Sequence, residues 1–388
     1  MIEIFDKDSD GAVIKVIGVG GCGGNAVEHM MTKMVTGVEF ICANTDMQAL
    51  KKSNAKVVLQ IGADITKGLG AGAKPEIGRE SALEDRDSIA ETIDGADMLF
   101  ITAGMGGGTG TGAAPIIAEV AREMGILTVA VVTKPFAFEG KRTKVAQEGL
   151  EELSQYVDSL IVIPNEKLMD VLGEDVTVVE AYRAANDVLH NAVSGIAEII
   201  NCPGLVNVDF ADVRTVMSEM GMAMMGSAEA SGPDRARIAA AQAVASPLLE
   251  DVNLANARGV LVNISASSSF KMREYYDVMN TIKEFTAEDA TVIVGNVMDE
   301  NMGDNLRVTM VATGLNGSVA KRQAKPELKV MTTLRDGTTN QPIFSQVVAE
   351  EEEPAVFTSN SRRAQVEAMK NSGIEEYDIP AFLRKQAD

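Results

Sequence analysis

The chain has 388 residues, 46% of them hydrophobic, which is enough for more than one domain with a sizeable core. Aromatic residues make up only 4% and Trp is absent, so aliphatic side chains and the 21 Met should build that core. The formal net charge of −21 argues against a general nucleic-acid binder, which would need a basic footprint. It does not exclude nucleotides, because backbone N–H groups can hold phosphate without lysine.

The cysteines and the N-terminus suggest a cytoplasmic location. Cys22, Cys42 and Cys202 form an odd, scattered set, which favours a reducing compartment over a disulfide framework. Residues 1–11 are acidic and lack a long apolar core, so they predict an N-terminal extension and no signal peptide. Since no charge-free apolar run reaches about 18 residues, we expect no direct membrane insertion.

Residues 12–175 predict a doubly wound α/β domain with a mostly parallel sheet. The segment "AVIKVIGVG" is followed by a glycine loop, a helical pattern and the strand "VEFICANTD", which is typical of a βαβ unit. The runs "AKVVLQIG", "ADMLFITAG", "ILTVAVVTK" and "SLIVIPN" continue the strands, mostly as the near-continuous apolar segments of a sheet covered on both faces. Helical patterns alternate with them, and "PEIGRESALEDRDSIAETI" is interpreted as one helix.

The second half of the chain changes character after a long helical pattern. Residues 176–202 predict a central helix, which ends at "NCPG". Residues 203–315 predict a second, smaller α/β domain, in which "ATVIVGNVM" and "LRVTMVATGL" are expected to pair as antiparallel strands. Residues 316–373 are polar and predict a flexible, disordered linker. Residues 374–388 regain apolar side chains, which favours a docking peptide over an inert end.

The first glycine loop predicts contact with a phosphate group. The segment "GVGGCGGN" satisfies the pattern G-x-G-x-x-G through Gly18, Gly20 and Gly23, so the backbone could approach an anion at the start of a helix. Asp46 closes the next strand, as an acid that contacts ribose would. The alternative interpretation is that these glycines serve only a tight turn.

The second glycine loop, "GGGTGTG" at residues 106–112, also follows a strand and opens a helix. Two such loops at the carboxyl ends of strands in one sheet would form a single anion cradle, to which Thr109 and Thr111 add hydroxyls. A third glycine-rich stretch begins at Lys67. Because the lysine-containing P-loop pattern is absent, we expect a cation, Mg²⁺, to help neutralise the phosphates.

The motif "GGGTGTG" resembles the signature of the tubulin/FtsZ superfamily, and residues 12–315 resemble the bacterial FtsZ family of division-ring GTPases. The tail "DIPAFLRKQAD" resembles that of gamma-proteobacterial members. The resemblance implies a GTPase that polymerises head to tail and assembles in the cytoplasm at midcell, under the inner membrane. The resemblance implies GTP and GDP as ligands, bound together with Mg²⁺. K⁺ is a candidate monovalent ion.

The resemblance also implies a set of nucleotide-binding residues, among which Asn186 would contact the guanine edge. The full set is Gly21, Cys22, Gly23, Gly24, Asn25, Gly107, Gly108, Thr109, Gly110, Glu139, Arg142, Asn165 and Asn186. Cys22 replaces a glycine of many members. The segment after Glu139 is about one residue shorter than in relatives, which leaves Lys141 as an alternative to Arg142. Tyr182 could stack on the base or be an ordinary buried tyrosine.

The segment "NVDFADV" resembles the family loop that enters the nucleotide site of the next subunit. The resemblance implies catalytic roles for Asn207, Asp209 and Asp212, because carboxylates near a γ-phosphate can orient and polarise a water. The residues alone predict a helix N-cap, and both roles can coexist. Hydrolysis would then occur in trans at a heterologous contact, which produces open filaments.

The tail implies partners other than the chain itself. It resembles the peptide that binds membrane-tethering division proteins such as FtsA and ZipA, and regulators of division are further expected partners. The residues that would carry this contact are Asp378, Ile379, Pro380, Phe382 and Leu383.

Two other functions compete with this hypothesis. A nicotinamide oxidoreductase would explain the first glycine loop and Asp46, but the only histidines, His29 and His190, lie in helical patterns and suggest no hydride-transfer site. A nucleotide-binding scaffold without hydrolysis is disfavoured by the intact "NVDFADV" segment.

Overall fold

The computed structural model describes residues 11–173, 175–201, 208–219, 221–249, 257–287 and 290–315. These residues all belong to one compact unit, Met1–Lys321. The predictions for Cys202, Asn207, the linker and the tail peptide lie outside the described residues.

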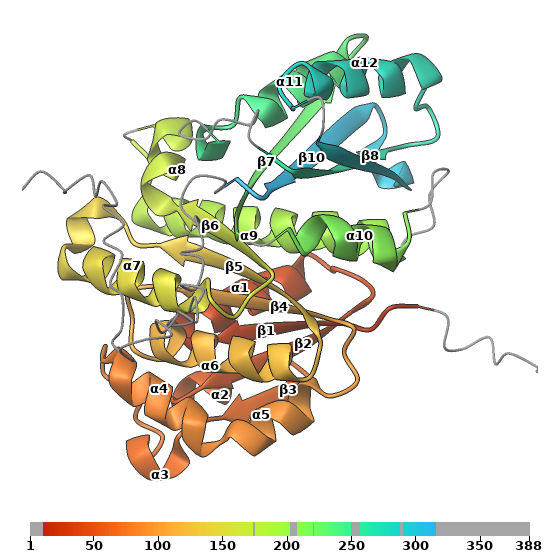
Figure 1. The fold of residues 1–388 in the computed structure, drawn as a ribbon. Helices are drawn as coiled ribbons and strands as arrows, with labels where there is room; N and C mark the ends of the chain where they lie inside the picture. The colour runs from red at the N-terminus through yellow and green to blue at the C-terminus, as the bar shows by residue number, and fades with distance from the viewer. Residues whose placement is uncertain are drawn as a thin grey trace, which may run out of the picture. The chain divides into compact units, whose positions relative to one another are not determined.

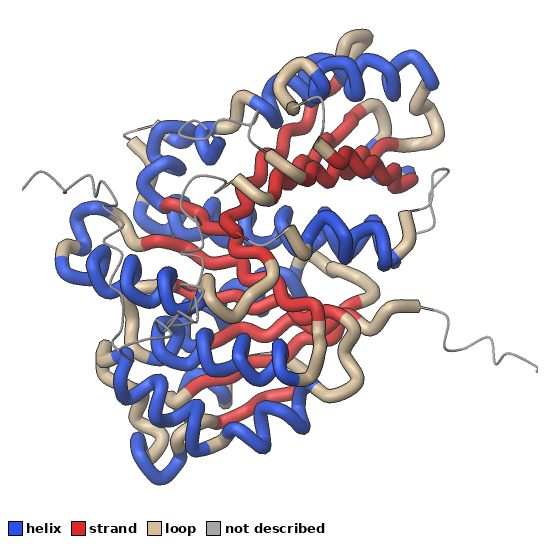
Figure 2. The backbone as a smooth tube through the Cα atoms, viewed as in Figure 1, coloured by secondary structure: helices blue, strands red, loops and turns tan. Residues whose placement is uncertain are grey.

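The strands and helices alternate along the first half of the chain (Figures 1 and 2). The strands are β1 Ile14–Val19, β2 Val38–Asn44, β3 Val57–Gln60, β4 Met98–Gly104, β5 Leu127–Lys134, β6 Ser159–Pro164, β7 Gly221–Ser231, β8 Gly259–Ala266, β9 Thr291–Met298 and β10 Asn305–Thr313. The helices are α1 Gly20–Thr32, α2 Met47–Leu50, α3 Ala63–Thr66, α4 Pro75–Glu84, α5 Arg86–Ile93, α6 Thr109–Glu123, α7 Lys141–Leu153, α8 Asn165–Leu172, α9 Val178–Asn201, α10 Phe210–Met217, α11 Arg235–Val244 and α12 Met272–Lys283.

Strands β1 to β6 form a parallel sheet in the order β3-β2-β1-β4-β5-β6. Side chains of β1 alternate between two cores, as the period of a strand requires. Ile14 and Val16 join the core that includes α1 and α9, whereas Ile17 and Val19 join the core that includes α6. The sheet is therefore covered on both faces, which confirms the predicted doubly wound α/β fold.

Helix α9 is the long central helix that the sequence predicts. Its buried residues Leu189, Val193 and Ile196 pack in one core with β1 of the first sheet region and with Leu261 of β8 and Val311 of β10. In Figure 1 this helix lies between strands β1–β6 and strands β8 and β10. One helix thus packs against both halves of the described chain.

Strand β7 was not predicted, and it joins the two strand groups. It runs parallel to β6 at its start, where Ser159 pairs with Gly221, and antiparallel to β10 along the rest. The predicted antiparallel pair of β9 and β10 is wrong, because β8 lies between them and pairs with β9 in parallel. Helix α12 supplies the crossover that a parallel pair needs.

The segment predicted as a single helix forms two. Helix α4 ends at Glu84 and α5 begins at Arg86, while Asp85 between them adopts φ −104° and ψ 26°. The Asp85 carboxylate accepts a hydrogen bond of 2.6 Å from the backbone N–H of Gly62. This contact with the preceding loop holds the chain out of the helical conformation at Asp85.

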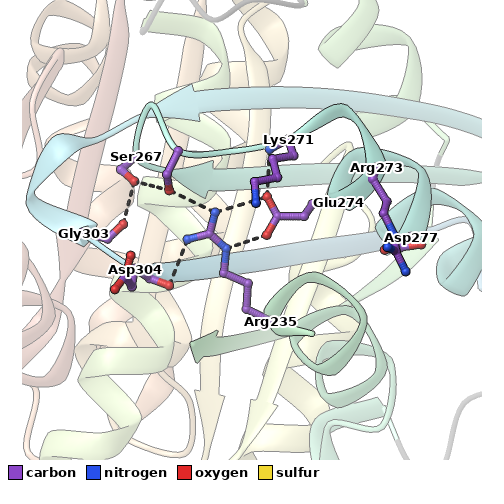
Figure 3. Close-up of polar contacts among 9 residues, drawn as sticks. Arg235, Ser267, Lys271, Arg273, Glu274, Asp277, Gly303 and Asp304 are labelled. Atoms are coloured by element: carbon purple, nitrogen blue, oxygen red, sulfur yellow. Dashed lines mark hydrogen bonds and ion pairs between the residues drawn. The ribbon is translucent and has the colours of Figure 1, made fainter. Parts of the chain in front are cut away.

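A buried ion pair fixes the helices that cover β8 and β10 (Figure 3). Arg235 of α11 donates to both carboxylate oxygens of Glu274 of α12, at 2.7 and 3.2 Å. The same guanidinium donates to the carbonyl of Asp304 and to the hydroxyl of Ser269. The guanidinium of Arg235 thus makes four hydrogen bonds in a site where its side chain is only 6% exposed.

Candidate nucleotide-binding site

The two predicted glycine loops lie against each other at the carboxyl ends of neighbouring strands β1 and β4. A Cβ atom added at Gly20 would lie 2.9 Å from the backbone N of Gly110, and Gly20 has a φ of +74°. Any larger residue there would push the loops apart. Glycine at position 20 is therefore needed for the loops to meet at the starts of α1 and α6.

The third glycine-rich stretch packs against the second loop. A Cβ added at Gly108 would lie 2.9 Å from Cβ of Ala71 and from the backbone N of Lys74. The hydroxyl oxygens of Thr45 and Thr109 are 2.7 Å apart and share a hydrogen bond. The second loop is thus supported from the loop after β2 and from the segment before α4.

Arg142, the residue predicted to reach the nucleotide with Lys141 as its alternative, contacts the second loop directly. Its Nε donates to the carbonyl of Gly106 at 3.2 Å, and its guanidinium pairs with Glu139 at 2.5 Å. Glu139 also accepts from the backbone N–H of Phe136. The sequence-predicted pair of Glu139 and Arg142 therefore lies beside the loop at the start of α7.

A cavity of about 550 Å³ extends from the first glycine loop to α9. It brings together the predicted residues Cys22, Asn25, Asn165, Tyr182 and Asn186. The Tyr182 side chain is 42% exposed, so the interpretation of an ordinary buried tyrosine is wrong. Asn165 is 4% exposed and its Oδ1 has no hydrogen-bond partner, although buried polar atoms normally have one. An unsatisfied acceptor therefore lies in the wall of this cavity.

A second cavity of about 330 Å³ adjoins the same loop on the side of β2 and α2. Its lining includes Gly21, Gly24 and Asp46. A Cβ at Gly21 or Gly24 would meet nothing within 4 Å, so the exposed backbone faces free space. Asp46 accepts from the N–H groups of Gln48 and Ala49 and caps α2. The residues present thus fit a ligand with both a phosphate chain and a planar base.

The acidic segment lies away from these cavities. Asp209 accepts a hydrogen bond of 2.8 Å from the backbone N–H of Asp212 and caps α10, which confirms the predicted N-cap. Neither residue lines the two cavities. Asn186 and the end of α9 at Asn201 are separated by about 22 Å along the helix axis, and α10 follows that end. One subunit therefore does not bring the acidic residues to its own glycine loops.

Several residues of the larger cavity were not predicted from the sequence. Thr133, Val179 and Arg183 line it, and so does His29, which had been seen only as part of a helical pattern. Thr133 could have been found, because it lies at the carboxyl end of β5, where parallel strands converge on a ligand. No sequence signal marked Arg183 or His29. The Nε2–H of His29 donates to the Asp187 carboxylate at 2.8 Å, so His29 links α1 to α9.

Two family models match the chain. Residues 13–173 match the GTPase domain of the tubulin/FtsZ family, and residues 221–316 match the C-terminal domain of the FtsZ family. The curated protein "Cell division protein FtsZ" of Coxiella burnetii is 56% identical over 387 residues, which covers 99% of each chain. The chain belongs to the FtsZ family.

Other relatives support the FtsZ assignment. The protein named "Cell division protein FtsZ" of Pseudomonas aeruginosa is 56% identical and covers 100% of both chains. A solved FtsZ dimer from M. jannaschii superposes with a TM-score of 0.76 at 42% identity, covering 80% of this chain and 90% of the other.

Among the described helices, none combines the length and the apolar character that a bilayer span requires.

Proposed function

We propose that this FtsZ-family GTPase hydrolyses GTP at the contact between successive subunits of a filament. The chain is a GTP-dependent polymerising protein of cell division, like the relatives whose sequence it shares over its whole length. The finer proposal concerns which residues hold the nucleotide and which complete the site.

The nucleotide would span the two cavities that share Asn25. The phosphates would lie on the backbone N–H groups of Gly21 to Asn25 and Gly107 to Gly110, where the helix ends favour negative charge. The base would enter the larger cavity, where Asn186 can pair with guanine and Tyr182 can stack on it. Mg²⁺ would enter with the nucleotide and neutralise part of the phosphate charge, because its preferred ligands are phosphate oxygens and water.

The ribose and the loop geometry would be set by side chains already in place. Glu139 and Arg142 form an ion pair beside the second loop, and Arg142 holds the Gly106 carbonyl. Asn165 offers its unpartnered Oδ1 to a sugar hydroxyl, which is a donor. These contacts would position the γ-phosphate toward the open side of the loops.

The acidic residues would act on the next subunit. Asp209 and Asp212 lie beyond the far end of α9 from Asn186, and this separation carries the proposal. A head-to-tail contact would place Asp212 of one subunit near the γ-phosphate of another, where its carboxylate can orient a water for attack. Asn207, in the same motif, lies outside the described residues and is proposed to act with them.

The test is the dependence of turnover on protein concentration. We expect phosphate release per chain to be nearly absent below a threshold concentration and to rise with light scattering above it, with GTP and not with ATP. A self-contained site would instead give a constant rate per chain at every concentration. That result, obtained with sedimentation showing only single subunits, would contradict the proposal.

The tail is proposed to bind membrane-tethering division proteins such as FtsA and ZipA, which would bring the filament to the inner membrane at midcell. Deletion of residues 378–388 should leave the GTPase rate per chain unchanged while it abolishes binding to these partners. Binding by fluorescence anisotropy of the purified partner measures this directly. Unchanged binding by the shortened chain would show that the tail is not the docking segment.

A further inference from the structure

Cys22 lines the proposed nucleotide site; the residue is exposed, but its Sγ is partly enclosed by neighbouring protein atoms. It lies in the first turn of α1 and its Sγ is 3.9 Å from the hydroxyl of Thr133. A Cβ added at Gly104 would lie 2.7 Å from that Sγ, so the thiol sits close to the end of β4. Cys42, in contrast, is only 2% exposed and its Sγ accepts from the hydroxyl of Ser53.

The surroundings of Cys22 form a built ligand cavity. Cys22 shares the cavity of about 550 Å³ with Asn165, whose buried Oδ1 lacks a partner. A group attached to Sγ would project into this space or across the first glycine loop. It would occupy volume that the sugar and the first phosphates need.

The state of the thiol decides whether phosphate can bind beside it. Burial among the surrounding protein atoms raises the pKa of the Cys22 thiol above its usual value, despite the hydrogen bond to Thr133. At neutral pH the side chain is therefore an uncharged thiol, which does not repel a triphosphate. A bulky group on the sulfur would have the opposite effect, because it fills the site.

We propose that Cys22 is a thiol–disulfide exchange site for low-molecular-weight disulfides, and that a mixed disulfide at Cys22 and a bound nucleotide exclude each other. This inference rests on the proposed function, since it assumes that the nucleotide occupies the cavity. It deepens that function by making GTP binding, and hence assembly, dependent on the redox state of one side chain.

The exchange needs no reactant beyond the disulfide itself. The Cys22 thiol loses its proton, and the thiolate attacks one sulfur of the disulfide. A bond forms between Sγ and that sulfur while the original S–S bond breaks. The other half leaves as a thiolate and takes up a proton, so atoms and electrons balance. Because only the thiolate attacks, the rate should rise as the pH is raised from neutral to alkaline.

The experiment treats the full-length, nucleotide-free protein with oxidised glutathione at alkaline pH and follows the Cys22 peptide by mass spectrometry. GTP binding is measured first on the reduced protein. We expect a glutathione adduct at Cys22, loss of GTP binding, and recovery of binding after dithiothreitol. With GDP at 100 times its Kd, labelling at Cys22 should slow about 100-fold, because only the free fraction can react.

A Cys22→Ser variant provides the control for the other cysteines. Its own GTP affinity should be the same before and after the treatment, since serine cannot form the disulfide. Three results would overturn the inference: no adduct at Cys22, labelling at Cys22 that GDP does not slow, or unchanged GTP affinity of the adduct. Failure of the reduced, untreated protein to bind GTP would instead overturn the proposed function, and the inference with it.

Discussion

At the scale of single residues, Asp209 and Asp212 hold different positions in one turn. The carboxylate of Asp209 is engaged by the backbone N–H of Asp212, whereas no hydrogen bond or ion pair is described for the Asp212 carboxylate. A free carboxylate is the group that can reach across a subunit contact. This difference leads to separate predictions for the two residues.

Asp212→Ala should retain GTP binding and assembly but lose hydrolysis by at least about 100-fold, the usual contribution of a group that orients or deprotonates the attacking water. Phosphate release from sedimented filaments measures this loss. Asp234→Ala is the matched control, because Asp234 precedes α11 and makes no side-chain cap hydrogen bond. Normal turnover by filaments of the Asp212 variant would remove this residue from the mechanism.

Asp209 should contribute to stability as well as to chemistry. Asp209→Ala removes the cap of α10 and should lower the free energy of unfolding by about 1 kcal/mol, as measured by urea denaturation. Asp209→Ser should restore most of that stability, because its hydroxyl can accept from the Asp212 N–H. If the carboxylate also acts in catalysis, the serine variant will be stable yet slow. A serine variant with full turnover would limit Asp209 to capping.

At the scale of elements, the sequence predicts strands well where burial dictates composition. Strands β4 (MLFITAG) and β5 (LTVAVVTK) are mostly apolar because both faces of the sheet are covered. The glycine runs after β1 and β4 mark the loops. Strand β7, "GMAMMGSAEAS", lacks β-branched residues, so its own sequence has a low propensity for a strand. Its pairing with β10 holds it extended. The misplaced β9–β10 pair shows the same limit, since short sequence separation does not decide which strands are neighbours.

The residues of the candidate site also fall into those that the sequence predicts and those that it does not. The glycine loops, Asn25, Asn165 and Asn186 were predictable because a motif or a strand end marks each of them. Arg183 and His29 were not, because their place on the cavity depends on how α9 packs against α1. The contact of Arg142 with Gly106 could not be derived either, since it depends on where α7 begins relative to the second loop.

The ion pair between α11 and α12 should make stability depend on acid pH. Burial raises the pKa of Glu274, but hydrogen bonds from Arg235 and from the Lys271 N–H, with the charges of both residues, lower it by more. A carboxyl group with a lowered pKa in the folded state contributes stability above its unfolded value of about 4.5, and this is lost as the pH falls through the folded value. Urea denaturation over a pH series measures this loss.

Glu274→Gln should therefore lower the stability at neutral pH by about 3 kcal/mol, because it leaves the charge of Arg235 buried without its counter-charge. It should also remove that residue's share of the acid dependence. Asp277→Asn on the same helix is the control, since Asp277 pairs with Arg273 at 3.8 Å and the Arg273 side chain is 88% exposed (Figure 3). This exposed pair is expected to contribute less than about 1 kcal/mol. Equal losses in the two variants would contradict the argument.

At the scale of the whole molecule, the helix α9 sets the distance between the nucleotide site and the acidic loop. Asn186 and Tyr182 lie in its first half, and α10 follows its last residue. Because a helix is rigid over this length, the two half-sites cannot meet within one chain without disrupting the core around Leu189 and Val193. In the proposed mechanism each hydrolytic event therefore needs a second subunit, which predicts complementation between two inactive variants.

Asp212→Ala subunits should bind GTP but supply no acidic group to a neighbour. Gly21→Leu subunits should fold, because a side chain at Gly21 meets nothing within 4 Å, but they fill the space for phosphate while their acidic loop stays intact. Each variant alone should be inactive. In a mixture, contacts that combine the GTP of the first with the loop of the second are complete, so turnover should exceed the sum of the separate rates. Sedimentation of labelled Gly21→Leu subunits with the filaments verifies that they join, and a mixed filament without added turnover would mean that each chain must complete its own site.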